Sequence, residues 1–202
     1  MMSKISGLYG ITIDNDLDIQ ARVQAALKGG ANIIQYRDKS YLPDREKIAE
    51  RLVELCHEYD AVLIINDDLD LALATNADGV HLGRDDLDVK AAREKIGDKI
   101  IGVSCYNKLE LALEAEQQGA DYVAFGRFFP SVTKPGAVPA ETSLLQEAKA
   151  MLSLPIVAIG GITTENAKLL IQAGASSVAV IDGLFNQQNI KKTAEEFSKL
   201  FR

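Results

Sequence analysis

Short runs of apolar residues alternate along the chain with longer segments in which apolar residues recur every three or four positions. The short runs are typical of strands in a parallel sheet buried on both faces, and the longer segments are typical of amphipathic helices. Glycine follows several of these helical segments, as at Gly97 and Gly174, where it commonly ends a helix. We therefore expect strands at residues 8–13, 33–37, 61–66, 79–82, 99–104, 122–125, 156–159 and 177–181, and helices at residues 17–28, 44–59, 69–75, 87–96, 108–118, 141–152, 165–173 and 190–201.

Eight strand–helix units in strict alternation within 202 residues predict a (β/α)8 TIM barrel near the lower end of its size range. A doubly wound open sheet is the alternative, because it has the same alternation of elements. No linker, low-complexity run or block of like charge interrupts the pattern. The whole chain, residues 1–202, is therefore predicted to form a single domain.

Polar side chains gather on one face of the predicted strands. In the second strand, Gln35 and Arg37 share a face, and bulky apolar residues occupy the other. The same separation recurs in the next three strands. Because bulky apolar residues can pack under the surrounding helices, the polar set is expected inside the barrel, near the carboxyl ends of the strands, where such barrels carry their active sites. This set consists of Gln35, Arg37, Asn66, His81 and Ser104.

The segment of residues 126–139 contains three of the five prolines of the chain, so neither a regular helix nor a central strand can pass through it. Long irregular segments inside a compact domain are commonly binding loops or lids. Ser131 and Thr133 supply hydroxyl groups beside the ammonium group of Lys134, a combination that suits a phosphate. The alternative is a surface connector with an ordinary solvated lysine.

Further charged and glycine-rich residues follow the other strands. Arg37 and Lys39 can bind an anionic phosphate, and the alternative is a loop with internal ion pairs. Asp67 and Asp86 follow neighbouring strands, so their carboxylates can hold one Mg²⁺, although acidic residues before helices are commonly only caps. Gly161 lies after the seventh strand, in a loop where these barrels often bind phosphate.

Composition and charge narrow the possible partners. The net charge is -7, and no basic cluster is present, which argues against nucleic acid as the main partner. No apolar run approaches the roughly 18 residues that cross a membrane, and the start of the chain lacks the features of a signal peptide. Two widely spaced cysteines without metal-type spacing suggest a reduced, cytoplasmic protein. A homo-oligomer is possible.

Six short motifs occur in a fixed order along nearly the whole chain: residues 35–39 (QYRDK), 65–67 (IND), 78–83 (DGVHLG), 102–104 (GVS), 130–135 (PSVTKP) and 157–162 (VAIGGI). With these motifs the chain resembles the thiamine-phosphate synthase family. The resemblance implies an enzyme that transfers a pyrimidinylmethyl group from its diphosphate to a thiazole phosphate. The implied products are thiamine phosphate and diphosphate, formed by a dissociative mechanism in which diphosphate leaves first.

The resemblance also assigns roles to individual residues. The implied catalytic residues are Arg37, Lys39, Ser104 and Lys134. The implied ligands of the pyrimidine diphosphate are Gln35, Tyr36, Arg37, Asp38, Lys39, Asn66, Ser104 and Lys134. The implied ligands of the thiazole phosphate are Ser131, Val132, Thr133, Gly161, Ile181 and Asp182. Asp67 and Asp86 would hold one Mg²⁺ per subunit.

The chain departs from the commonest family pattern at several positions. Asp182 stands where serine is usual, and its carboxylate would repel a phosphate, so only its backbone N–H suits that ligand. Two rival interpretations stay open. One is a related barrel that only rearranges a thiazole phosphate, which would need neither the Mg²⁺ pair nor the clamp of residues 35–39. The other is a non-catalytic sensor of a thiamine-pathway phosphate.

Overall fold

The computed structural model describes residues 5–83, 88–130 and 138–202. Parallel strands form one closed barrel in the order in which they occur along the chain. This confirms the predicted (β/α)8 barrel and excludes the open sheet. The strands are β1 (Gly7–Ile11), β2 (Ala31–Tyr36), β3 (Val62–Asn66), β4 (Gly79–Leu82), β5 (Ile100–Tyr106), β6 (Tyr122–Gly126), β7 (Ile156–Ile159) and β8 (Ser177–Val180).

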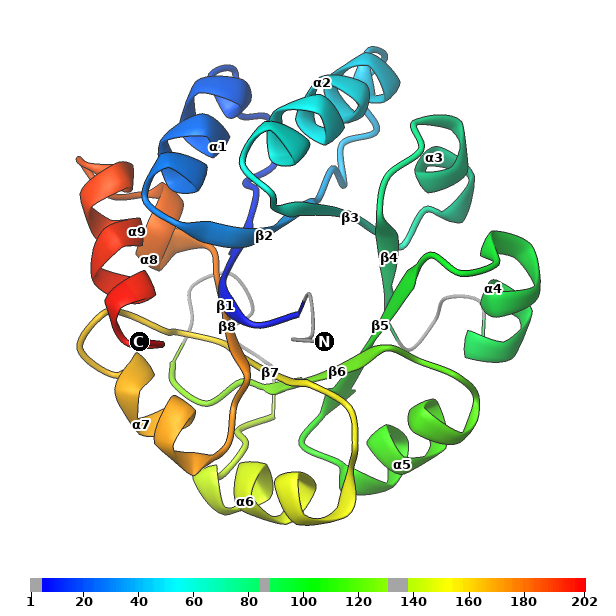
Figure 1. The fold of residues 1–202 in the computed structure, drawn as a ribbon, viewed down its shortest axis with the longest axis vertical. Coiled ribbons are helices and arrows are strands. Elements are labelled where there is room, and N and C mark those ends of the chain that lie inside the picture. Colours follow the sequence, from blue (N-terminus) through cyan, green and yellow to red (C-terminus); the bar gives the residue numbers. More distant parts are fainter. Residues whose placement is uncertain (1–4, 84–87, 131–137) are drawn as a thin grey trace.

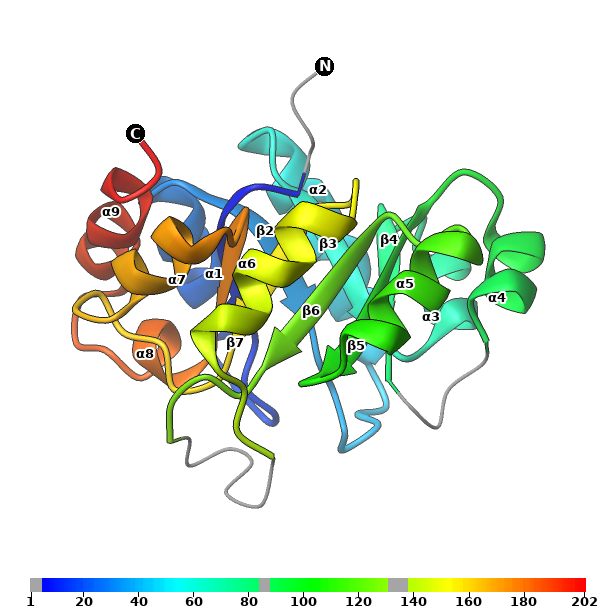
Figure 2. The same cartoon turned by 90° about the horizontal axis from the view of Figure 1, so that it is seen from below.

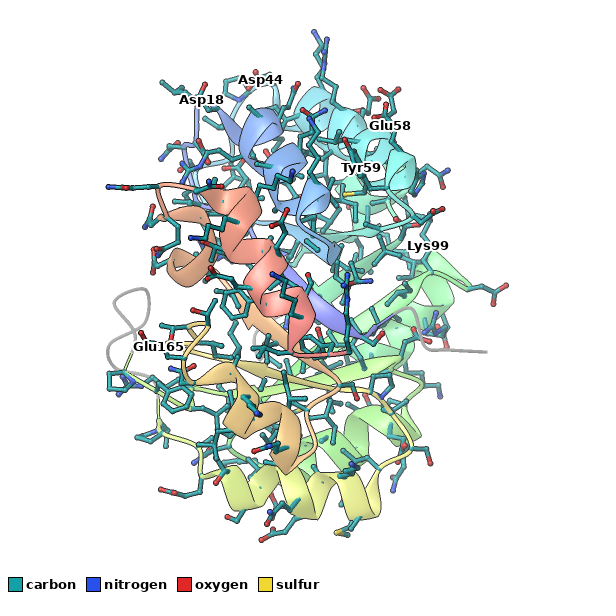
Figure 3. The ribbon with its side chains drawn as sticks, turned by 60° about the vertical axis from the view of Figure 1, so that its left-hand side comes forward. Asp18, Asp44, Glu58, Tyr59, Lys99 and Glu165 are labelled. Carbon is teal, nitrogen blue, oxygen red and sulfur yellow. The ribbon has the colours of Figure 1, made fainter. Side chains whose placement is uncertain are left out.

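Helices surround the barrel as an outer ring (Figure 1). They are α1 (Ile19–Lys28), α2 (Arg45–Glu58), α3 (Leu69–Ala74), α4 (Val89–Ile96), α5 (Leu109–Gln117), α6 (Thr142–Met151), α7 (Ala167–Ala173), α8 (Asp182–Phe185) and α9 (Ile190–Lys199). Helix α9 lies beside α1 and closes the ring (Figure 1). The Ser198 hydroxyl donates to the carbonyl of Gly30 over 2.9 Å. Exposed acidic side chains, among them Asp18, Asp44 and Glu58, lie on the outside of this ring (Figure 3).

Two separate apolar clusters form the core, as the alternation within the strands predicts. The larger cluster lies between the strands and the helices and contains Leu63 and Val80. The smaller cluster fills the barrel interior and contains Ile33, Ile64 and Val157. Six of the eight strands contribute buried residues to both clusters, whereas β4 contributes none to the interior cluster and β5 only the partly buried Ile100. The polar residues that share the inward faces therefore lie above the interior cluster, at the carboxyl ends of the strands.

The two ends of the barrel differ. Ile5 is only 3% exposed and belongs to the interior cluster, so the segment before β1 helps to close the amino end. The carboxyl ends of the strands and the loops that follow them lie along the lower edge of Figure 2, and the C-terminus lies on the opposite side. None of the helices in the described ranges combines the length and apolar character that a membrane crossing needs.

Several predicted boundaries were wrong for local reasons. The first helix begins at Ile19 rather than Leu17, whose side chain is 99% exposed. The carboxylate of Asp16 accepts the N–H of Asp18 over 3.1 Å and holds these residues in a turn before the helix. The short helix α8 was not predicted at all, because four residues are too few to show a helical period. Because α8 begins at Asp182, strand β8 ends at Val180, one residue earlier than expected.

Candidate active site

A cavity of about 340 Å³ opens at the carboxyl end of the barrel. Its lower wall is apolar and includes Ala124, Val157 and Ala179. Its upper wall carries the five polar side chains that strand alternation placed inside the barrel, which confirms that part of the prediction. These are Gln35, Arg37, Asn66, His81 and Ser104.

Above this apolar wall, a chain of hydrogen bonds joins buried and partly buried side chains. The Gln35 amide donates to the Tyr9 hydroxyl over 2.8 Å, and the hydroxyls of Tyr9 and Tyr122 lie 2.8 Å apart. His81 contacts the Tyr122 hydroxyl through Nδ1 at 3.0 Å and Ser104 through Nε2 at 2.9 Å. Polar groups enclosed by the interior cluster are therefore satisfied by one another.

Arg37 is held in place by the loop after β1. The Asp14 carboxylate lies 2.5 Å from Nη1 of Arg37 and also accepts the backbone N–H of Lys39 over 2.8 Å. The Thr12 hydroxyl accepts the backbone N–H of Arg37 over 3.0 Å. Because one end of the guanidinium group is fixed, its remaining donors can be directed into the cavity. The sequence interpretation missed Thr12 and Asp14.

Asp67 lies directly after β3, beside the cavity rather than on its wall, in a neighbouring hollow that Asn66 also lines. Its carboxylate faces cationic and amide donors. It contacts the ammonium group of Lys39 and accepts from Nδ2 of Asn66 over 2.6 Å. Its φ angle is +61°, which few residues other than glycine, asparagine and aspartate adopt readily. The neighbouring carboxylate of Asp68 is committed elsewhere, because it caps α3 by accepting the N–H of Leu71 over 2.8 Å.

These contacts show how well Asp67 and its neighbours could bind a divalent cation. Asp67 is about one quarter exposed, and its carboxylate oxygens are ligands that Mg²⁺ prefers, so it suits a divalent cation once Lys39 turns away. Asp68 caps α3 and pairs with Arg45, so its carboxylate is already engaged. Among residues 5–83, 88–130 and 138–202, no group of three or more potential ligands forms a complete metal site. The second expected ligand, Asp86, lies outside the described residues.

A glycine-lined wall lies opposite Arg37. The loops after β6 and β7 pair through the N–H of Phe129 and the carbonyl of Gly160, which are 3.0 Å apart. Gly161 has a φ angle of +63°, and a Cβ there would lie 2.3 Å from the carbonyl oxygen of Pro130. Only glycine therefore fits this contact. Within the described part of the chain, the backbone N–H of Gly161 has no hydrogen-bond acceptor.

Ile181 and Asp182 complete that wall after β8. The Asp182 carboxylate accepts from Nδ2 of Asn186 over 2.6 Å, so its charge is partly engaged by its own helix. Asp182 also has a further interaction within the structure, and its side chain is not free.

Not every expected residue reaches the cavity. Tyr36 packs into the outer cluster and lines a second hollow between β2 and α3. Asp38, Lys39 and Asp67 line the same hollow and not the cavity. Burial raises the pKa of the Tyr36 hydroxyl, which has no hydrogen-bond partner in the structure. Ser131, Val132, Thr133 and Lys134 lie outside the described residues.

Cys105 has the wrong environment for a nucleophile. It is fully buried next to Ser104, and its thiol donates to the carbonyl of Val103 over 3.6 Å. Burial raises the pKa of this thiol to about 12, so the reactive thiolate is absent near neutral pH.

A family model described as thiamine monophosphate synthase matches residues 8–184. The chain belongs to the thiamine monophosphate synthase family. The match spans every strand after the first residue of β1 and reaches α8. The family predicted from the six motifs is therefore confirmed.

Individual relatives of this family agree over the full length. The chain is 54% identical to the thiamine-phosphate synthase of Nitrosococcus oceani, and the alignment covers all of this chain and 95% of that protein. It is 51% identical to the thiamine-phosphate synthase of Nitrosospira multiformis, covering 98% and 87%. A solved thiamine phosphate pyrophosphorylase from Pyrococcus furiosus superposes with a TM-score of 0.88 at 37% identity, covering 98% and 96%.

Proposed function

We propose that the chain catalyses the reaction of this family. It would transfer the 4-amino-2-methylpyrimidin-5-ylmethyl group from its diphosphate to 4-methyl-5-(2-phosphoethyl)thiazole. The observation that carries the proposal is the cavity that presents Arg37 and Asn66 on one side and Gly161 on the other. Two separate anion-binding walls suit two phosphorylated substrates, and the apolar floor suits the rings between them. We place this reaction in the cytoplasm.

The pyrimidine diphosphate would lie against β2, β3 and β5. Gln35 offers an amide to the ring, and Ser104 offers a hydroxyl from the opposite side of the cavity. Arg37 would bind the diphosphate with donors that its contact with Asp14 leaves available. Lys39 would add a second positive charge from the rim, and Lys134 would add a third.

Mg²⁺ would be held by Asp67, together with Asp86, at one site per subunit. When bound, it would neutralise charge on the diphosphate and make it a better leaving group. Lys39 would then turn from Asp67 towards a phosphate oxygen, because its ammonium group already lies at this rim.

The thiazole phosphate would lie against the glycine-lined wall. The N–H of Gly161 and the backbone after β8 at Ile181 and Asp182 provide donors where such barrels commonly bind phosphate. Ser131, Val132 and Thr133 would close over the same group. The Asp182 side chain would stay on its own helix with Asn186.

The reaction needs little proton transfer. The bond between the methylene carbon and the diphosphate oxygen breaks first, and its electrons leave with the diphosphate. The thiazole nitrogen then bonds to the methylene carbon and becomes positively charged. Arg37, Lys39 and Lys134 would stabilise the departing charge, while the apolar wall that includes Val157 would keep water from the carbon cation.

The direct test mixes both phosphorylated substrates with the folded protein and Mg²⁺, and measures thiamine phosphate by fluorescence after oxidation. We expect product, and EDTA should abolish it. Folded protein that binds the thiazole phosphate in calorimetry without forming product would contradict the proposal and favour the sensor. Conversion of one thiazole isomer into another without the pyrimidine substrate would favour the rearranging barrel.

Gly161→Ala is expected to raise KM for the thiazole phosphate about tenfold, because the new methyl group meets the Pro130 carbonyl and displaces the phosphate-binding backbone. KM for the pyrimidine diphosphate should change much less. Gly97→Ala is the matched control, since Gly97 has a φ angle of +62° but no atom within 4 Å of the new Cβ. Equal effects of the two variants on thiazole KM would count against this wall as the phosphate site.

A further inference from the structure

The hydrogen-bond chain along the cavity wall joins side chains from five different strands. It runs from Gln35 through Tyr9, Tyr122 and His81 to Ser104. Tyr9 and Tyr122 are almost completely buried, at 1% and 0% exposure. The ends of the chain, Gln35 and Ser104, are the two groups that face the pyrimidine in the proposed function. The three middle residues have no role in the reaction as described above.

The direction of this chain follows from the hydrogen bonds of Tyr9. The Tyr9 hydroxyl accepts a hydrogen bond from Nε2 of Gln35, so its own proton has one place to go, the Tyr122 oxygen. If Tyr122 instead donated to Tyr9, the Tyr9 proton would be buried without an acceptor, which is unfavourable. Tyr9 therefore donates to Tyr122.

The same reasoning extends to the histidine. Tyr122 accepts from Tyr9, so its proton goes to Nδ1 of His81, 3.0 Å away. Nδ1 is then the acceptor nitrogen, and the ring proton of a neutral imidazole lies on Nε2. Nε2 donates to the Ser104 oxygen over 2.9 Å. The hydroxyl proton of Ser104 is left to point into the cavity.

Packing holds the rings in the positions that this direction requires. The His81 and Tyr122 rings stack with centroids 5.6 Å apart, and Tyr9 meets the edge of Tyr122 at 6.1 Å. Gly102 leaves the space for Tyr122, because a Cβ at Gly102 would lie 1.9 Å from its ring. Burial raises the pKa of the hydroxyls of Tyr9 and Tyr122 far above the usual range, so both stay protonated.

We propose that Tyr9, Tyr122 and His81 are positioning residues that fix one direction of hydrogen bonding across the barrel, so that Ser104 acts as a donor towards the pyrimidine diphosphate. The identity of that ligand rests on the proposed function, while the direction of the chain does not. Gln35 keeps its carbonyl oxygen as an acceptor on the opposite side. A neutral aminopyrimidine, with an N–H donor and acceptor atoms, matches this pair of groups.

The tautomer of His81 tests the direction without any substrate. The chain contains two histidines, and His57 lies exposed on α2, where it contacts Asp78 at 3.0 Å. A His57→Gln protein labelled with ¹⁵N-histidine therefore reports His81 alone. We expect the tautomer with the proton on Nε2. A proton on Nδ1, or an even mixture of the two forms, would overturn the proposal.

Two phenylalanine variants separate positioning from a general loss of buried hydroxyl groups. Tyr122→Phe removes the donor to Nδ1, so the His81 signal should become a mixture of tautomers and kcat should fall about tenfold. Tyr9→Phe also removes one buried hydroxyl, but Tyr122 can still donate to His81, so the tautomer should be unchanged. An unaltered tautomer in Tyr122→Phe would refute the assigned direction. If the tautomers behave as expected but neither the unsubstituted protein nor the variants form product, the proposed reaction is wrong. The assigned direction of the hydrogen bonds then still holds.

Discussion

Asp67→Asn is expected to lower kcat by about 100- to 1,000-fold, equivalent to about 3–4 kcal/mol, with little change in melting temperature. The substitution removes the negative charge that faces Lys39 and would hold Mg²⁺. It keeps the side-chain shape, and asparagine tolerates the φ angle of +61°. Steady-state kinetics at several Mg²⁺ concentrations, with a thermal melt of the same preparation, measure both quantities.

The adjacent carboxylate provides the control. Asp68→Ala removes the cap of α3 and the ion pair with Arg45, so it should destabilise the fold by about 1 kcal/mol. Turnover should change only a few-fold, because Asp68 is committed to those structural contacts. If Asp67→Asn lost stability and activity in the same proportion as Asp68→Ala, the assignment of Asp67 to the reaction would be wrong.

Gly102→Ala is expected to destabilise the protein by about 3 kcal/mol and lower its melting temperature by about 6–12 °C. The new Cβ would lie 1.9 Å from the Tyr122 ring, which is fully enclosed in the barrel interior and cannot move aside without disturbing His81. Turnover should therefore fall as well. Thermal and urea unfolding, followed by circular dichroism, measure the loss of stability.

Gly10→Ala is the comparison for this effect. Gly10 also lies in a barrel strand, but its new Cβ would meet only side-chain atoms of Leu184 and Phe185 at 3.1–3.2 Å. These neighbours need to move by only a few tenths of an ångström, so the loss of stability should be clearly smaller. A Gly102→Ala protein as stable as Gly10→Ala would mean that Tyr122 does not fill the barrel as described.

Much of the cavity was predictable because strand side chains alternate strictly. An inward Gln35 forces Arg37 inward as well, and the same rule placed Asn66, His81 and Ser104 beside them. The rule also predicted that Tyr36 faces the helices, although the family resemblance grouped it with the pyrimidine ligands. Alternation requires only the sequence and a strand, so it does not depend on how distant parts of the chain meet.

The residues that were missed depend on contacts between distant segments. Asp14 lies in a loop without a periodic pattern, and its pairing with Arg37 appears only when β1 and β2 lie side by side. Tyr9 and Tyr122 read as ordinary apolar strand residues. Their inward positions in the strands predict only that each hydroxyl has a hydrogen-bond partner, because a buried phenolic hydroxyl needs one. The partner itself, a residue 113 positions away, could not be read from the local sequence.

A crystal structure with thiamine phosphate, diphosphate and Mg²⁺ bound would test most directly whether one end of the barrel holds both phosphorylated partners. We predict the pyrimidine between Gln35 and Ser104, the phosphate of the thiazole arm at Gly161, and diphosphate between Arg37 and Asp67. Diphosphate bound away from Arg37, or the thiazole phosphate away from Gly161, would contradict the account.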